Sequence, residues 1–257
     1  FLHNFLIIHP DILTELPTCQ TSNIRKEAAE ALILQGERLV RLEDIENAKT
    51  KFRTALEWNS ELKFDIEAKI RQLQQAAYLV KTGENLIQDG KIQNAVTKFQ
   101  EALKLDPGLN FEPKSKTVNL LLDKGRNLIK GTEDKVQEAI LAYNQAEKID
   151  SNMITADNWN TLCWSGSIQR HAKQVMFACE KAVKLAPDVA YIRDSRGLAR
   201  ALTGNIKGAI EDFQFFINNT DDNNDYYKAQ KAKRQAWINA LQAGKNPFTD
   251  KELDSLR

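Results

Sequence analysis

The sequence predicts an all-α fold, a right-handed helical solenoid of about five antiparallel helix pairs with further helices at both ends. Three observations predict it. Small residues recur at a fixed spacing, large apolar residues recur between them, and a proline closes two of the segments, at Pro107 and Pro187. Antiparallel helices approach closely only where the side chains between them are small, and larger neighbours fill the remaining space.

The segment Ala76–Pro107 shows the pattern most clearly. If its first residue is position 1, then Gly83, Ala95 and Ala102 occupy positions 8, 20 and 27, and the proline occupies position 32. This spacing is typical of a tetratricopeptide repeat, a helix–turn–helix unit of about 34 residues. Each repeat is therefore predicted to be one pair of antiparallel helices.

Five such units can be aligned within an array that spans residues 21–218. They are predicted near residues 29–62, 76–109, 118–153, 156–189 and 190–218. The positions that align them are Gly36, Ala48 and Ala55; Gly83, Ala95 and Ala102; Gly125, Ala139 and Ala146; Cys163, Val175 and Ala182; and Gly197, Ala209 and, less well matched, Phe216. The first two positions are 12 residues apart in four units and 14 in the third, which indicates a longer turn around Gly131-Thr132.

The connections between units follow from composition. Lys63–Gln75 contains helix formers and no glycine or proline, so it is predicted to lengthen the next helix. Pro107, Gly108 and Pro113 indicate a loop, followed by a helix that starts near Glu112.

Further helices are predicted at both ends of the array. Residues 1–20 are predicted to form a capping or connecting helix broken at Pro10, and the array then begins with a helix from about Ile24. Residues 224–257 are predicted to be C-terminal capping helices, and Thr249 with Glu252 forms a predicted capping box for the last of them.

Composition limits the classes of function. Lysine and arginine number 36 against 35 acidic residues, a balance that gives no electrostatic footprint for nucleic acid or an anionic membrane. No apolar run reaches the length of a membrane span. The three cysteines show no CxxC spacing, which favours a reduced, cytoplasmic location. Cys163 and Cys179 are expected to be unbridged, poorly reactive residues in apolar slots. A first residue Phe1 suggests a piece of a longer protein.

A more specific resemblance appears in the last hundred residues and at the N-terminus. The segments that carry it are Asn160–Trp164, Ala178–Ala182, Leu185–Pro187, Arg193–Ala199, Gly244–Phe248, Phe1–Pro10 and Cys19-Gln20. Through these segments the chain resembles the C-terminal tetratricopeptide region of large cyanobacterial multidomain proteins, in which that region follows WD-repeat propellers and a STAND-type NTPase or a caspase-like peptidase. The resemblance implies a non-catalytic module of a signalling or effector protein.

The sequence contains none of the common motifs of catalytic, nucleotide-binding or metal-binding sites. No glycine-rich phosphate loop, HExxH or CxxC motif occurs, so neither a cofactor nor a metal is predicted. Cys163 and His171 form the one conceivable nucleophile and base, but Cys163 occupies a packing position and His171 falls in an inter-helix turn. His3 and His9 form no ligand cluster. The chain is therefore predicted not to be an enzyme.

The predicted binding surface is the concave groove lined by the first helix of each unit. The candidate groove residues are Asn119, Arg126, Asp157, Asn160, Trp164, Tyr191 and Asp194. Asp157, Asn160 and Trp164 share one helical face, so with Tyr191 and Asp194 they are predicted to form a pocket with an aromatic floor and acidic edges. Trp164 has a second interpretation, burial under the next unit. The lysine and asparagine clamp for a C-terminal carboxylate is not reproduced.

The sequence thus predicts a helical-repeat scaffold that binds a protein or peptide, or docks onto upstream domains of its own polypeptide. One alternative is a substrate-recruiting or regulatory subunit of a peptidase or NTPase assembly. Another is a nucleic-acid-binding helical repeat, which would need a basic stripe, whereas the basic and acidic residues are interleaved.

Overall fold

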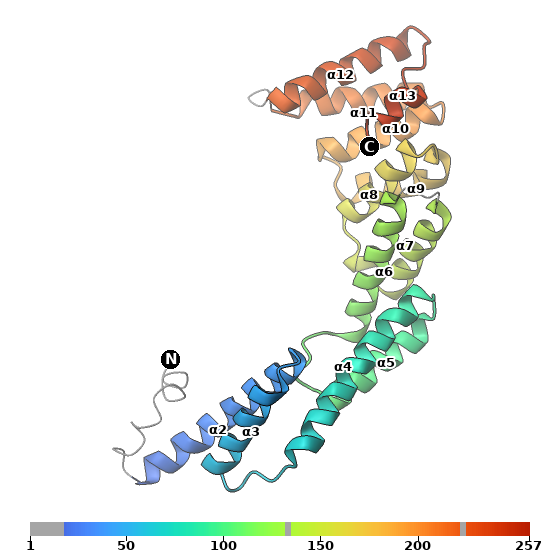
Figure 1. Ribbon diagram of the computed structural model, residues 1–257. Helices are drawn as coiled ribbons and strands as arrows, with labels where there is room; N and C mark the ends of the chain where they lie inside the picture. Colours follow the sequence, from blue (N-terminus) through green and yellow to red (C-terminus); the bar gives the residue numbers. More distant parts are fainter. Residues whose placement is uncertain (1–17, 132–134, 222–224) are drawn as a thin grey trace. The chain divides into compact units, whose positions relative to one another are not determined.

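The computed structural model describes residues 18–131, 135–221 and 225–257 (Figure 1). The helix predicted for residues 1–20 lies outside the described residues except for its last three residues. Thr132, part of the longer turn predicted for the third unit, also lies outside them. The described residues form twelve α-helices and one short 3-10 helix, with no strand. They divide into two compact units, unit 1 (Phe1–Pro113) and unit 2 (Lys114–Arg257). The predicted all-α class is confirmed.

Unit 1 contains two helix pairs. Its helices are α2 (Thr18–Arg41), α3 (Ile45–Trp58), α4 (Ile66–Gln88) and α5 (Ile92–Leu105). The predicted lengthening by Lys63–Gln75 is confirmed, because α4 already begins at Ile66 after the N-cap Asp65. The start of α2 at Thr18 precedes the predicted one, because no glycine or proline interrupts the chain between Thr18 and Ile24.

Unit 2 contains three further pairs and two terminal helices. Its elements are α6 (Pro113–Lys130, starting at the unit boundary), α7 (Val136–Ile149), η2 (Ser151–Met153), α8 (Ala156–Ile168), α9 (Ala172–Leu185), α10 (Ala190–Leu202), α11 (Ile206–Asn218), α12 (Asp225–Gln242) and α13 (Asp250–Asp254). None of the helices in the described part of the chain is long and apolar enough to cross a membrane.

The predicted small-residue positions are all buried, and the first of them explains why the pairs are so close. A Cβ atom placed on Gly83 would lie 2.5 Å from the ring of Phe99, sixteen residues later on the partner helix. The same contact joins Gly36 to Phe52, Gly197 to Phe213 and, with the longer turn, Gly125 to Tyr143. Each ring is fully buried. The pairs therefore have the tetratricopeptide type of packing, with a ring closed onto a glycine.

The second helix of four pairs also ends alike. The backbone N–H of the residue after the helix donates to the carbonyl of the last small residue, Ala55, Ala102, Ala146 or Ala182. After α5 this residue is Asp106, whose carboxylate also accepts from Arg41 on α2 at 2.6 and 2.7 Å. The Asp-Pro step thus fastens the end of α5 to α2.

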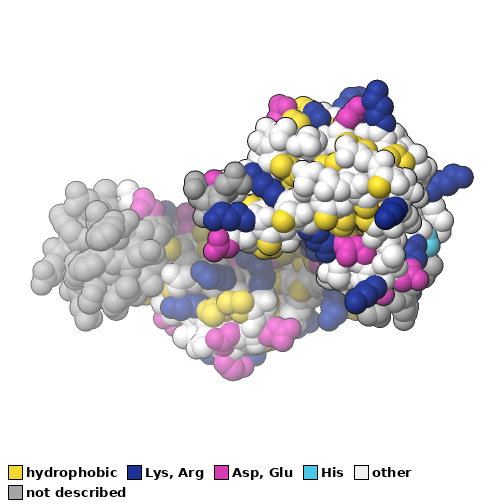
Figure 2. All heavy atoms as spheres, turned by 90° about the horizontal axis from the view of Figure 1, so that it is seen from above, with side chains coloured by type: hydrophobic (Ala, Val, Ile, Leu, Met, Phe, Trp, Pro, Cys, Tyr) yellow, Lys and Arg dark blue, Asp and Glu magenta, His cyan; other side chains and the backbone are white. Residues whose placement is uncertain are grey.

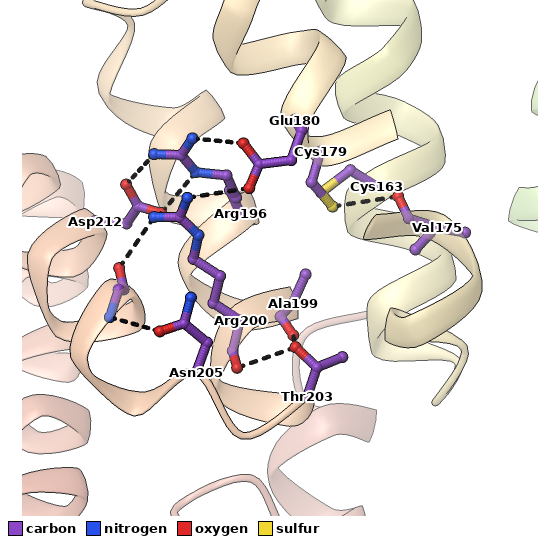
Figure 3. Close-up of polar contacts among 11 residues, drawn as sticks. Cys163, Val175, Cys179, Glu180, Arg196, Ala199, Arg200, Thr203, Asn205 and Asp212 are labelled. Carbon is purple, nitrogen blue, oxygen red and sulfur yellow. Dashed lines mark hydrogen bonds and ion pairs between the residues drawn. A yellow bond between two sulfur atoms is a disulfide. The ribbon is translucent and has the colours of Figure 1, made fainter. Parts of the chain in front are cut away.

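The α8–α9 pair departs from the pattern, and here the sequence prediction is wrong. Cys163 and Cys179 are joined by a disulfide, with Cα atoms 4.8 Å apart (Figure 3). Both residues are fully buried, as predicted, but they are bridged. The sixteen-residue separation is that of the glycine–aromatic contacts, so the two side chains face each other across the pair. Neither sulfur carries a thiol in this structure.

The C-terminal helices close the core of unit 2. Trp237 of α12 packs against Phe213 and Phe248, with ring centroids 5.4 and 5.0 Å away. Thr249 caps α13 by accepting from the Glu252 N–H, but the predicted capping box is only half formed. The Glu252 carboxylate instead accepts from Trp237 Nε1 and pairs with Lys233 Nζ, both of α12 and both at 3.0 Å.

Candidate functional site

A groove in unit 2 combines residues of four helices. It encloses about 320 Å³. Its lining consists of Asn160 and Trp164 of α8; Tyr191, Asp194 and Ser195 of α10; Phe216 of α11; and Tyr226, Tyr227, Gln230 and Arg234 of α12. We call these ten residues the aromatic groove. Four of the seven sequence-predicted site residues, Asn160, Trp164, Tyr191 and Asp194, therefore lie together.

The helix-pair packing places these residues. Consecutive first helices α8 and α10 are neighbours, and residues three or four apart on each share one face. Asn160 with Trp164 and Tyr191 with Asp194 thus form adjacent rows.

Trp164 satisfies both interpretations given by the sequence. It is half-buried and packs against the core cluster that contains Leu198 and Phe213. It also lines the aromatic groove and a second cavity of about 580 Å³ beside Ile129 and Leu256. One face of the indole therefore supports the fold while the ring remains part of the groove wall.

Asp194 does not form the predicted acidic edge. Its carboxylate accepts from Arg234 at 2.5 and 2.9 Å, and both side chains are at least nine-tenths buried. The Arg234 guanidinium also lies 4.6 Å from the centroid of the Trp237 ring. Desolvation raises the pKa of Asp194, and the paired arginine opposes this shift. The groove thus contains a neutralised ion pair in place of a free negative charge.

Asp157 lies at the rim. Its carboxylate accepts from the Tyr191 hydroxyl at 2.5 Å, and this hydrogen bond is the main cause of a raised Tyr191 pKa. The contact links α8 to α10 at the exposed side of the groove and orients the Tyr191 ring, which is 49% exposed.

Asn160 supplies the most informative polar atom of the groove. Its Oδ1 is buried and accepts no hydrogen bond. A buried acceptor without a donor costs free energy, on the order of 1–3 kcal/mol. An N–H group that reached this atom would remove that cost, and Asn160 is the residue with such an atom that lines the aromatic groove.

Two predicted residues lie elsewhere. Asn119 and Arg126 are on α6, and neither lines the aromatic groove. Arg126 pairs with Asp123 of the same helix at 3.1 Å, and Asn119 is exposed. Six groove residues were missed: Ser195 of α10, and from α11 and α12 Phe216, Tyr226, Tyr227, Gln230 and Arg234. The adjacent tyrosines at the start of α12 were the available signal, but that helix was interpreted as a cap.

A catalytic or metal centre finds no support in the described residues. No group of histidine, cysteine and acidic side chains there has the arrangement needed to hold a metal ion. Cys163, considered in the sequence as a conceivable nucleophile and set aside, is bonded to Cys179, and a disulfide sulfur is not a thiolate. His171 is the residue that precedes α9, in the predicted inter-helix turn.

Comparisons with known proteins assign this chain to no family. No protein-family model and no curated protein matches the chain. Among solved structures, the tetratricopeptide domain of P58(IPK) is similar, with 17% sequence identity and a TM-score of 0.40. The match covers 86% of this chain and 57% of the other, so it spans just over half of that domain chain. A TM-score this low does not establish a common fold, and the fold assignment depends on the helix pairs above.

Proposed function

We propose that this chain is a protein-interaction module that holds a peptide segment of a partner in the aromatic groove. The observation that carries the proposal is the combination of exposed rings with the unpaired Asn160 acceptor. Tyr191, Tyr226 and Tyr227 are 49%, 63% and 37% exposed and gather beside Trp164. Tyrosine and tryptophan dominate the binding energy at many protein interfaces.

The groove chemistry defines the segment that fits. An apolar side chain would cover the rings, and a neighbouring amide N–H would donate to Asn160 Oδ1. A basic side chain is disfavoured, because Asp194, one of the predicted acidic edges of the pocket, is already neutralised by Arg234. The expected partner segment is therefore apolar and amide-bearing.

The wider setting is part of the same proposal. The resemblance to the repeat regions of multidomain signalling or effector proteins supports a module of a larger polypeptide, which binds a partner or its own upstream domains. A substrate-recruiting role in a peptidase or NTPase assembly would use the same groove. A cytoplasmic location stays a prediction, and the bridge leaves it without the support of free cysteines.

Nucleic acid is the weaker alternative. In Figure 2, which views the α12 end of the molecule, basic side chains are interspersed with acidic ones and with hydrophobic atoms. A surface that neutralises phosphates needs clustered lysine and arginine. The mixed charge of this face gives that alternative no electrostatic support.

The test is selection of a peptide followed by calorimetry. A random peptide display library is selected on the wild-type chain and depleted on Trp164→Ala. The recovered peptides are expected to bind Trp164→Ala and Tyr191→Ala at least about tenfold more weakly, the loss typical of a hot spot. The matched control is Tyr78→Ala, whose side chain is 65% exposed on α4 of unit 1. Equal affinity for all three variants, with unchanged helix content, would place the site elsewhere.

A further inference from the structure

The α8–α9 pair is the one aligned pair without a ring in its central slot. In the other four pairs a fully buried Phe or Tyr closes onto a glycine of the first helix. In this pair Cys163 stands in the glycine position and Cys179 in the ring position, with the same separation of 16 as in three of those pairs. We propose that the disulfide replaces the glycine–aromatic contact, and that oxidation therefore controls how firmly α8 is held in the aromatic groove.

The side chains around the bridge explain why it is needed. The buried cluster there consists of Cys163, Ala172, Cys179 and Ala199, with Met176 and Leu202 packed against it. The two cysteine side chains together are smaller and less apolar than the phenylalanine side chain that occupies this slot in three other pairs, and the gain from burying a side chain scales with its apolar area. The covalent bond supplies the attachment that the ring supplies in the other pairs.

One further contact remains when the bridge is open. A Cβ atom on Gly166 would lie 2.5 Å from Val175, so α8 and α9 also approach closely one turn farther along. The pair is therefore expected to stay helical after reduction but to open more often, because its central contact is lost. Local opening of this kind is measured directly by amide hydrogen exchange.

The bridge is connected to the groove through α8. Asn160 and Trp164, both groove residues, lie three residues before and one residue after Cys163. Asn160 therefore lies one helical turn before Cys163, and Trp164 is the next residue along the chain. Loosening of α8 at Cys163 would displace both side chains, and with them the groove wall. The partner site and the redox-active bond thus belong to one element.

A reductant can approach the disulfide from one side, although side chains cover it. Ala172 and Leu202 cover it, and both also line an open cavity of about 490 Å³ with Arg170, Lys173 and Thr203. A dithiol reductant attacks one sulfur, forms a mixed disulfide and closes its own ring. The protein S–S bond gains two electrons and two protons to give two thiols, and the reductant leaves as a disulfide.

Hydrogen exchange on the full chain tests the proposal, with dithiothreitol as the reductant. Alkylation and mass spectrometry first establish that the peptides of Cys163 and Cys179 are bridged before reduction and free after it. Reduction is then expected to speed exchange of the α8 and α9 amides by about tenfold or more, within the limit set by closing a loop of this length. The α2–α5 amides of unit 1 serve as the internal control.

Two double variants test whether faster exchange comes from loss of the contact between Cys163 and Cys179 or from a general effect of the reductant on the protein. Cys163→Gly with Cys179→Phe restores the ring contact, so slow exchange is expected with or without dithiothreitol. The variant Cys163→Ala with Cys179→Ala lacks both the disulfide and the glycine–ring contact. Its α8 and α9 amides are expected to exchange as fast as those of the reduced wild type, with or without dithiothreitol. If the Gly–Phe variant does not fold, the wild-type comparison alone decides. Unchanged α8–α9 exchange on reduction, or free thiols in the air-oxidised chain, would overturn the proposal.

Discussion

The buried arginines and carboxylates of unit 2 are paired, whereas three buried side-chain atoms among the described residues of that unit have no hydrogen-bond partner: Tyr143 Oη, Asn160 Oδ1 and Ser167 Oγ. Arg196 donates to Asp212 at 2.7 and 2.8 Å and to Glu180 at 2.9 Å, and Arg200 bonds both carboxylates at 3.0 Å (Figure 3). Desolvation would raise the pKa of Glu180, but the two arginines outweigh it and lower that pKa. Of the three unpaired atoms, only Asn160 Oδ1 belongs to a residue that lines the aromatic groove, which is why we connect it with a ligand.

Asp194→Ala is expected to destabilise the protein and not to act as a clean binding variant. It leaves the buried Arg234 without its carboxylate, which costs about 3–5 kcal/mol. The free energy of unfolding from denaturant titration measures this. The control is Glu61→Ala, because the exposed Lys26–Glu61 pair contributes about 1 kcal/mol or less. Equal losses in both variants would mean that the Asp194–Arg234 pair is not formed as described.

Tyr143→Phe is expected to be neutral or stabilising at pH 7. The Tyr143 hydroxyl is buried without a hydrogen-bond partner, and three other pairs already place Phe in the same slot. Burial raises its pKa from 10.0 to about 12. Above pH 10 the unfolded tyrosine ionises while the folded one stays protonated, so stability falls as pH rises through that window.

The alkaline range gives the sharper readout for this variant. At pH 11 the wild type should have lost about 1.4 kcal/mol more than Tyr143→Phe, one pKa unit of difference. Denaturant titrations at pH 9 and pH 11 measure the change in each protein. A parallel loss in both proteins would contradict the burial of this hydroxyl.

At the scale of elements, the fold depends on how closely two helices can approach. Four of the five first helices carry a glycine opposite a ring, and fully buried alanines occupy most of the other crossings. Where the ring is missing, in α8–α9, a covalent bond takes its place. The same geometry therefore tolerates two chemical solutions, provided that the first-helix residue is small.

Ala95→Leu is expected to cost about 1–3 kcal/mol, because added methylenes overpack the α4–α5 crossing. Ala95 of α5 is fully buried. Thermal and denaturant unfolding give the loss. Ala77→Leu on α4 is the matched control, since Ala77 is exposed and its substitution should be nearly neutral. A neutral result at Ala95 would mean that the helix register is wrong.

At the scale of the whole molecule, the two units contribute differently to the proposed function. Unit 1 consists of two helix pairs held by glycine–phenylalanine contacts and the Arg41–Asp106 bridge. Unit 2 contains the aromatic groove, the disulfide and the arginine network. In a repeat array each segment is stabilised mainly by its neighbours. Substitutions in unit 1 therefore serve as controls for those in the groove.

The sequence by itself determined the helix pairs, because their cause is local and periodic. Small residues at fixed spacing specify close crossings, and these needed no knowledge of distant segments. It also placed Asn160, Trp164, Tyr191 and Asp194 on one surface, because equivalent positions of successive first helices align.

Only the tertiary structure decided which of those side chains are available. Arg234 lies 40 residues after Asp194, and no repeat pattern connects α12 to α10, so neutralisation of the carboxylate was invisible in the sequence. The Cys163–Cys179 bridge was missed for another reason. Its spacing equals that of the glycine–ring contacts, but that equivalence is apparent only once Gly83 is seen facing Phe99 across its pair. Periodicity defines a helix's faces, whereas partners from other helices set each side chain's charge, exposure and bonding.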